Sequence, residues 1–219
     1  MIRTTRPAKN NKYYLHGGGG YNKCIRIKGN FVLDNCVGYC YGAFLEECGR
    51  QACKLPTSDA ETWYGHNDGY PRGSLPAVGA IICWRKGKIG RADGCGHVAM
   101  VTSVSSDLKT ISIFQSGYSA KKCWGSILKK PYKIAGYTFQ GFIYNPYLVP
   151  SGTVNRKKGT KADVVQVQAY LRYRGLYKGA IDGSFGTQTY NAVRAFQVKN
   201  RLKTDGSVGP KTIALMKVK

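Results

Sequence analysis

The chain has 219 residues, enough for one large domain or two small ones, and its 42% hydrophobic content allows an ordinary globular core. Its net charge is +23, with 20 Lys and Arg against 8 Asp and Glu in residues 1–150, and 14 against 3 in residues 151–219. Such a charge favours a polyanionic partner: nucleic acid, an anionic membrane surface or a bacterial wall bearing teichoic acids. No apolar run is long enough to span a bilayer, so we expect no membrane insertion.

Residues 1–20 contain basic side chains but no apolar segment of the kind found in signal peptides, so we expect synthesis in a cytoplasm without a signal peptide. Residues 1–23, with four glycines at 17–20, are interpreted as a flexible lead-in. A cytoplasmic origin argues against disulfides among the eight cysteines, all of which precede residue 124. Their spacing also lacks the paired CxxC pattern of a structural zinc site, so we expect no metal or other cofactor.

Residues 34–49, DNCVGYCYGAFLEECG, predict a helix that Asp34 or Asn35 caps and Gly49 ends. Cys36 lies in its first turn, where the helix dipole favours ionisation of a thiol. Cys40 is one turn further along and gains little from the dipole. Cys36 is therefore the candidate nucleophile, and the alternative is that it is a small buried hydrophobe. The inward face is predicted to carry Cys36, Tyr39, Cys40, Ala43 and Phe44.

An α+β fold is predicted because this helix is followed by segments in which apolar residues alternate. Before these segments, residues 24–33 suit a short strand and turn, and residues 54–79 suit a loop with a short helix at 58–64. The predicted antiparallel strands are residues 80–84, 97–104, 110–115 and 142–147.

A thiol nucleophile needs a base, and the base needs a group that holds its tautomer. Of the three histidines, His16 lies in the lead-in, His66 lies in a loop, and His97 opens a predicted strand. If strands 97–104 and 110–115 form a hairpin, Gln115 lies beside His97 and its carbonyl can accept the imidazole N–H. The alternatives are a core histidine and a polar strand end. Together with Cys36, the two residues give a papain-like layout.

The segments NCVGYCYG, GAIICW, GHVAMV and FQSGYSA resemble the CHAP domain, the cysteine, histidine-dependent amidohydrolase/peptidase family, over about residues 20–147. The resemblance implies that Cys36 is the nucleophile and His97 the base. The third residue of the family is commonly Glu, Asp or Asn, and Gln115 departs from this pattern. Some members bind calcium through an acidic loop before the cysteine, but residues 20–33 contain no acidic residue, so calcium is not expected.

Residues 149–162 are predicted to be a linker, and residues 163–219 a small three-helix domain. Asp163 is expected to cap a helix that runs to about Arg174, and Thr187 to cap a second helix. Pro210 is expected to open a third. Val164, Val167, Leu171, Val193, Phe196, Ile213 and Met216 are its expected core. The motif DGSxGxxT occurs at Asp182 and again at Asp205, each time before a helix.

This tail resembles the three-helix peptidoglycan-binding module over residues 160–217, on the strength of the DGSFG, AVRAFQ and DGSVGPKT segments. The resemblance makes Asp182, Phe185 and Gln197 candidates for contact with the wall. Phe185 equally suits the core, and Asp182 equally suits the chemistry of its turn.

The two resemblances together imply a phage endolysin, made in the infected cell and released to the wall through a membrane lesion made by a partner protein. Its substrate would be an amide bond of peptidoglycan, in a Gram-positive wall with anionic polymers, and we expect a monomer. One alternative is a non-catalytic protein that binds walls or polyanions. Nucleic-acid binding is not expected, because the basic residues are dispersed and no recognition motif is present.

Overall fold

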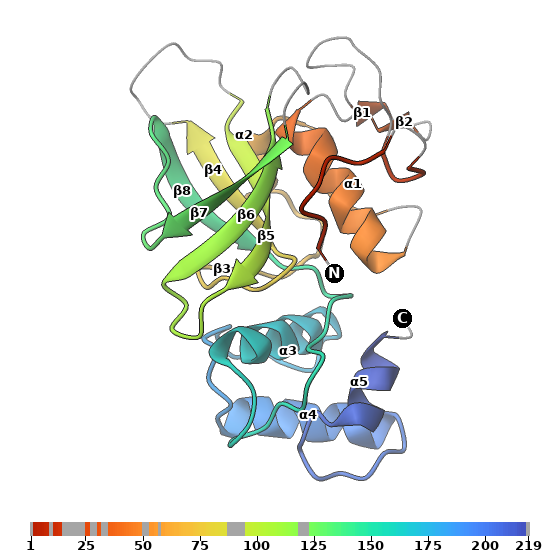
Figure 1. Ribbon diagram of the computed structural model, residues 1–219. Helices are drawn as coiled ribbons and strands as arrows, with labels where there is room; N and C mark the ends of the chain where they lie inside the picture. The colour runs from red at the N-terminus through yellow and green to blue at the C-terminus, as the bar shows by residue number, and fades with distance from the viewer. Residues whose placement is uncertain are drawn as a thin grey trace.

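The computed structural model describes residues 2–8, 11–14, 25–26, 30–31, 35–49, 53–56, 58–86, 95–117 and 123–217. A helix packed against a sheet forms the first part of the molecule, and three helices form the second part, as predicted (Figure 1). The helices are α1 (Cys36–Cys48), α2 (Ala60–Trp63), α3 (Lys161–Tyr173), α4 (Thr187–Lys199) and α5 (Pro210–Lys217). The strands are β1 (Ile25–Arg26), β2 (Asn30–Phe31), β3 (Arg72–Gly73), β4 (Ile81–Lys86), β5 (His97–Val104), β6 (Thr110–Ser116), β7 (Cys123–Lys129) and β8 (Tyr137–Ile143).

The main sheet has six strands in the order β3-β8-β4-β5-β6-β7, and each neighbouring pair is antiparallel. The predicted hairpin of β5 and β6 is present, with Met100 opposite Phe114. Strands β1 and β2 pair within the segment predicted as a short strand and turn. The α+β prediction for this part of the chain is confirmed.

Two strand predictions were incomplete. The last predicted strand, residues 142–147, overlaps β8 only at Phe142 and Ile143, because the chain turns away where Asn145 and Pro146 follow. Strand β7 was not predicted, because its exposed and half-buried residues give no clear apolar alternation. This strand lies at the edge of the sheet and pairs with the whole of β6.

Helix α1 begins and ends as the sequence predicts. The Asn35 side chain accepts a hydrogen bond of 2.9 Å from the Gly38 N–H, so Asn35 is the cap. Gly49 ends the helix in the left-handed conformation at φ 63°. The expected inward residues other than Cys36 are fully buried, and Cys36 is half-buried.

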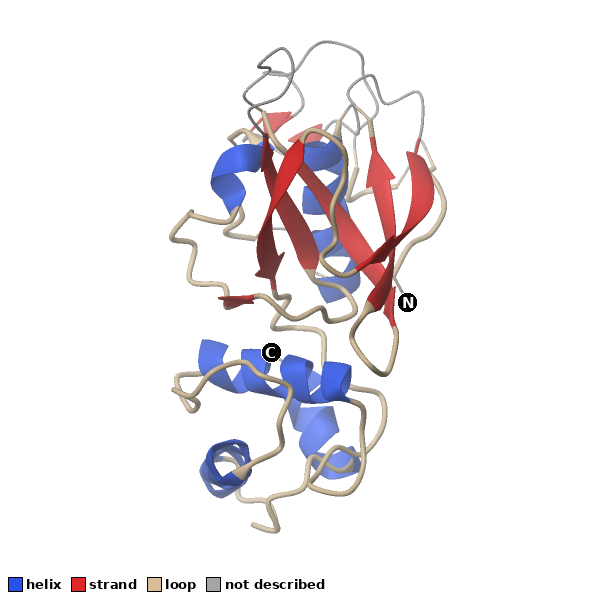
Figure 2. Cartoon of the chain, turned by 90° about the vertical axis from the view of Figure 1, so that its left-hand side faces the viewer, coloured by secondary structure: helices blue, strands red, loops and turns tan. Residues whose placement is uncertain are grey.

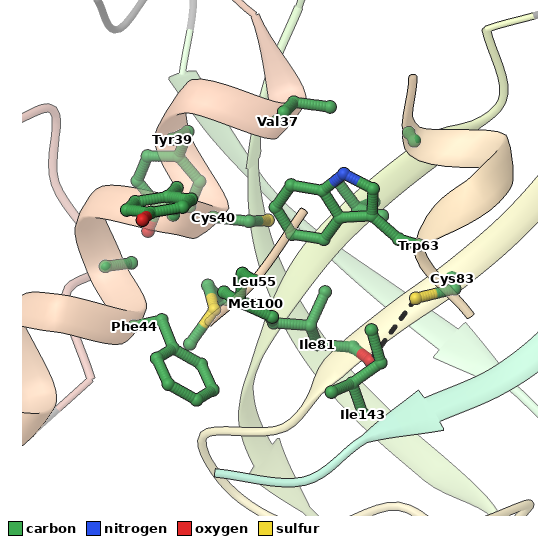
Figure 3. Packing of buried hydrophobic residues seen from close by; sticks show 14 of the residues in the cluster. Val37, Tyr39, Cys40, Phe44, Leu55, Trp63, Ile81, Cys83, Met100 and Ile143 are labelled. Carbon is green, nitrogen blue, oxygen red and sulfur yellow. Dashed lines mark hydrogen bonds between the residues drawn. The ribbon is translucent and has the colours of Figure 1, made fainter. Parts of the chain in front are cut away.

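One buried cluster of the first part lies between α1 and the sheet (Figures 2 and 3). Tyr39 contacts Phe114 of β6 edge to face, with ring centroids 5.6 Å apart. Figure 3 shows Cys40, Phe44 and Met100 within the same cluster. These contacts attach the helix to the two strands on which the sequence places the histidine and the glutamine.

The described residues of the lead-in pack on α1, in contrast to the flexible segment predicted. Tyr14 is fully buried and its hydroxyl donates to Glu46 at 3.0 Å. Arg3 forms an ion pair with the same carboxylate. A Cβ at Gly42 would lie 2.5 Å from the Tyr14 ring, so this glycine permits the close approach of the lead-in to the helix.

The expected core of the tail is confirmed, but two of its caps differ from the prediction. Thr160 caps α3, and Asp163 instead occupies the third helical position of a capping box. Gly186 precedes α4, and Thr187 is the first helical residue. The seven predicted core residues are all buried. Val154, from the stretch predicted as a linker, is also fully buried and pairs with Val208.

Helix α3 packs against both parts of the molecule, since it lies directly beneath the sheet in Figures 1 and 2. Val165 and Ala169 belong to the same buried cluster as Ala77 and Tyr144 of the first part. The Gln166 amide donates to the Val78 carbonyl at 2.9 Å. The tail is therefore docked on the first part through an apolar contact.

Among the described residues, no helix combines the length and the apolar character that crossing a bilayer requires.

The docking of α3 predicts that a tail substitution destabilises the first part. We expect Val165→Ala to lower the midpoint of urea unfolding by about 0.5–1 M, because truncating a buried valine costs about 2 kcal/mol. All three tryptophans precede residue 148, so their fluorescence reports the first part alone. Val198→Ala is the control, since Val198 is 63% exposed in the same tail. An unchanged tryptophan transition in Val165→Ala would show that the two parts unfold independently.

Candidate active site

Cys36, His97 and Gln115 line one cavity of about 420 Å³, at the end of the sheet where α1 begins. The cavity is bounded mainly by apolar and aromatic side chains around these three polar ones. Its other lining residues are Asn35, Val37, Cys95, Gly96, Ser116, Gly117, Trp124, Ile134 and Tyr137. The structure therefore brings together the three residues that the sequence proposed.

Cys36 is the first residue of α1, immediately after the Asn35 cap. N–H groups in the first turn of a helix have no partner within the helix, and with the dipole they stabilise negative charge. No acidic residue lies in this turn to oppose that effect. The position therefore suits a negatively charged group next to the cavity, such as a thiolate.

Backbone packing at Gly96 fixes the place of His97. Gly96 has φ 63°, and a Cβ there would lie 2.6 Å from both the Glu61 nitrogen and the Trp84 carbonyl oxygen. The preceding Cys95 carbonyl accepts the Glu61 N–H at 2.9 Å. Only glycine permits β5 to begin this close to α2 and β4.

The His97 imidazole lies between two aromatic rings. It stacks on Trp84 with centroids 5.8 Å apart and an interplanar angle of 26°, and it meets Tyr137 at 6.2 Å and 56°. Burial lowers the pKa of His97, and its hydrogen bond to Gln115 partly opposes that shift. The imidazole is therefore predominantly neutral near pH 7 in the absence of a nearby anion.

The hydrogen bond between His97 Nε2 and Gln115 Oε1 is 2.7 Å long. Because the amide oxygen can only accept, His97 Nε2 carries the hydrogen in this assignment and Nδ1 keeps its lone pair. An imidazole with a lone pair on Nδ1 can accept a thiol proton. The predicted contact of Gln115 with His97 is therefore present, and its orienting role stays a prediction.

Cys40 is not equivalent to Cys36. It is fully buried between α1 and the sheet, and Figure 3 shows its side chain pointing from the helix into the packed cluster. Burial, followed by the proximity of Cys36 and Cys83, holds the pKa of the Cys40 thiol well above its ordinary value. Cys40 therefore stays a neutral, enclosed thiol.

The other histidine that the structure describes, His66, does not join the cavity. His66 is exposed, and it is not among the residues that line the cavity. His16 and Cys24 lie outside the described residues. Within the part of the chain that the structure describes, no three His, Cys, Asp or Glu side chains cluster closely enough to hold a metal ion.

The DGSxGxxT repeat in the tail forms two equivalent turns, each built around a buried glutamine. The Gln197 amide donates to Asp205 at 2.9 Å and accepts from the Gly206 N–H at 2.8 Å. One helix earlier, Gln168 makes the same two bonds to Asp182 and Gly183, at 2.8 and 2.9 Å. These bonds give both glutamines and both aspartates a structural role.

The three tail residues proposed to contact the wall do not form one surface group. Gln197 is 1% exposed, Phe185 is half-buried beside the tail core, and Asp182 is exposed but bonded to Gln168. Their contact with a ligand stays a prediction.

Several residues around the cavity were not identified from the sequence. Trp84 and Tyr137 flank the imidazole, and Trp124 and Ser126 come from the unpredicted β7. Trp124 lies opposite Gln115 in the pairing of β6 with β7, so a prediction of β7 would have placed Trp124 beside the cavity.

Comparison with protein families confirms the two resemblances over most of their extent. Residues 27–117 match the CHAP domain, and residues 160–216 match the peptidoglycan-binding domain. The chain therefore carries a CHAP domain followed by a peptidoglycan-binding domain.

Individual relatives include cell-wall lytic enzymes. The chain is 44% identical over 62 residues to the spore cortex-lytic enzyme of Bacillus cereus, covering 28% of this chain and 24% of that protein. It is 45% identical over 51 residues to the N-acetylmuramoyl-L-alanine amidase CwlM of Mycobacterium tuberculosis, covering 23% and 13%. The chain thus spans a quarter or less of the length of these relatives. A crystal structure of an N-acetylmuramoyl-L-alanine amidase from Staphylococcus aureus aligns with 22% identity and a TM-score of 0.38, covering 49% of this chain and 30% of that one.

Two glycines with the same φ of 63° test the packing that fixes His97. We expect Gly49→Ala to cost about 1 kcal/mol, because only the left-handed backbone is penalised and no atom of the described residues lies within 4 Å of the added Cβ. Gly96→Ala should cost about 2 kcal/mol more, since its Cβ meets two backbone segments. Chemical denaturation of the two variants measures this difference. An equal loss of unfolding free energy in the two variants would show that the backbone around Gly96 can move to accept a Cβ.

Proposed function

We propose that this protein is a peptidoglycan hydrolase that cleaves an amide bond of the stem peptide or cross-bridge by a Cys–His thiol mechanism. The observation that carries the proposal is the shared cavity of Cys36, His97 and Gln115, with the imidazole bonded to the glutamine at 2.7 Å. The CHAP and peptidoglycan-binding matches support the same substrate class.

In the proposed mechanism, His97 Nδ1 accepts the Cys36 thiol proton and the sulfur attacks the amide carbonyl carbon. The tetrahedral oxyanion is stabilised by N–H groups at the start of α1, including that of Cys36. The C–N bond then breaks as the imidazolium returns its proton to the leaving amine. Water hydrolyses the resulting thioester with His97 again acting as base, which regenerates the thiol.

The tail would hold the enzyme on the wall, and the +23 charge would favour a wall with anionic polymers, as in Gram-positive bacteria. Within this proposal the protein acts as a phage endolysin, made in the host cytoplasm and active at the wall after release. Its two-domain composition and its charge suit that role.

Wall clearing by three matched proteins tests the hydrolase and its nucleophile together. We expect wild type and Cys40→Ala to clear purified Gram-positive walls at similar rates, because Cys40 is enclosed. Cys36→Ala should be slower by at least about a thousandfold, because it removes the nucleophile.

Clearing by Cys36→Ala at the wild-type rate would overturn the cysteine mechanism. If no protein clears the walls but all sediment with them, the protein is a wall-binding module without catalysis. For an active wild type, the residue at each newly released N-terminus separates an amidase, which exposes the first L-Ala, from an endopeptidase.

The neutral Gln115 predicts how the pH profile responds to substitution. A carboxylate at this position stabilises imidazolium more than an amide does, so it raises the pKa of His97. We therefore expect Gln115→Glu to retain activity within about tenfold and to move the limb of the profile governed by His97 to higher pH. The measurement is the rate of clearing from pH 5 to pH 10. A folded but inactive Gln115→Glu variant would contradict the role assigned to Gln115.

A further inference from the structure

We propose that Ser126 is a positioning residue that holds the Gln115 amide against His97. This inference rests on the proposed function, because its consequence is a correctly placed catalytic base. It extends the Cys36, His97 and Gln115 arrangement by one residue, on a strand that the sequence did not reveal.

The geometry places Gln115 between two partners. Its Oε1 accepts from His97 Nε2 at 2.7 Å, and its Nε2 donates to the Ser126 hydroxyl oxygen at 2.9 Å. In the pairing of β6 with β7, Ser126 lies opposite Ile113, two residues from Gln115 on the same face of the sheet. This diagonal relation is within reach of a long side chain.

A second hydrogen bond to the orienting amide matters because the residue is a glutamine. Its side chain has one more rotatable bond than asparagine, so a single hydrogen bond leaves the amide more conformations in which it loses His97. Gln115 is also buried, at 7% exposure, and a buried amide nitrogen without a partner is unfavourable. Removal of the Ser126 hydroxyl should therefore favour rotation of the amide toward another partner.

The position of Ser126 on β7 agrees with this role. The strand is an edge strand, and its neighbouring residue Ile127 is 72% exposed. Ser126 is half-buried and directs its hydroxyl to Gln115. An edge strand thus contributes the hydroxyl that accepts from the Gln115 amide.

The first test measures kcat and KM on solubilised peptidoglycan. We expect Ser126→Ala to lower kcat about tenfold, the effect of one ordinary hydrogen bond, with KM unchanged. Ser126→Thr should keep the wild-type rate because it keeps the hydroxyl. Ser126→Val has the shape of threonine without the hydroxyl, so it should be as slow as Ser126→Ala. Ser112→Ala is the control, because Ser112 lies on β6 but on the face opposite Gln115.

A double-mutant cycle separates positioning from a structural role. If Ser126 acts through Gln115, Ser126→Ala should have no further effect on kcat in a Gln115→Ala background. An equal loss in both backgrounds, a Ser126→Val variant as active as Ser126→Thr, or wild-type kcat in Ser126→Ala would each overturn the proposal.

A second readout does not depend on hydrolysis. We expect NMR titration of the His97 imidazole, assigned by comparison with His97→Ala, to show a lower pKa in both Ser126→Ala and Gln115→Ala than in wild type. Gln115→Ala removes the amide oxygen that stabilises imidazolium, and Ser126→Ala removes the bond that holds this oxygen in place. An unchanged His97 pKa in Ser126→Ala would overturn the positioning role. A wild type that hydrolyses nothing would overturn the proposed function, and the titration would still decide the role of Ser126.

Discussion

The contact between Tyr39 and Phe114 connects the two halves of the candidate active site. Tyr39 lies one turn after Cys36 on α1, and Phe114 immediately precedes Gln115 on β6. Because interiors are close-packed, a shift of either ring would displace the Cys36 thiol relative to the Gln115 amide, which is the proposed partner of the base. The proposed catalytic arrangement therefore depends on apolar packing between elements separated by more than sixty residues of sequence.

Two opposing electrostatic effects act on the imidazole. Burial between Trp84 and Tyr137 favours the neutral form, and the amide of Gln115 compensates only in part. A carboxylate would favour the charged form more strongly, so the proposed mechanism would take more of the stabilisation of a thiolate–imidazolium pair from the start of α1. Such a site needs accurate geometry more than charge, because a neutral hydrogen bond weakens steeply when its alignment is lost.

The sequence predicted those features that depend on interactions between residues close together in the chain. The caps of α1 at Asn35 and Gly49 and the hairpin that joins His97 to Gln115 follow from side-chain chemistry and from periods that span a few residues. Strand β7 could not be predicted, because an edge strand buries little and its pattern carries little apolar signal. Trp124 and Ser126 were missed with it. The Thr160 cap was missed because Asp163, its partner in the capping box, is an equally good cap in isolation.

The docking of the tail could not be predicted either, because Val165 and Ala169 lie outside the predicted tail core and their local pattern does not identify the surface that covers them. Helix α3 in fact presents one apolar face to its own domain, through Val167 and Leu171, and another to the CHAP part. Because α3 is buried on two sides, it fixes the orientation of the tail relative to the first part as well as joining them. In the proposed function, binding of the tail to the wall would therefore restrict the direction in which the catalytic cavity faces, so the tail would select among bonds as well as raise the local concentration of substrate.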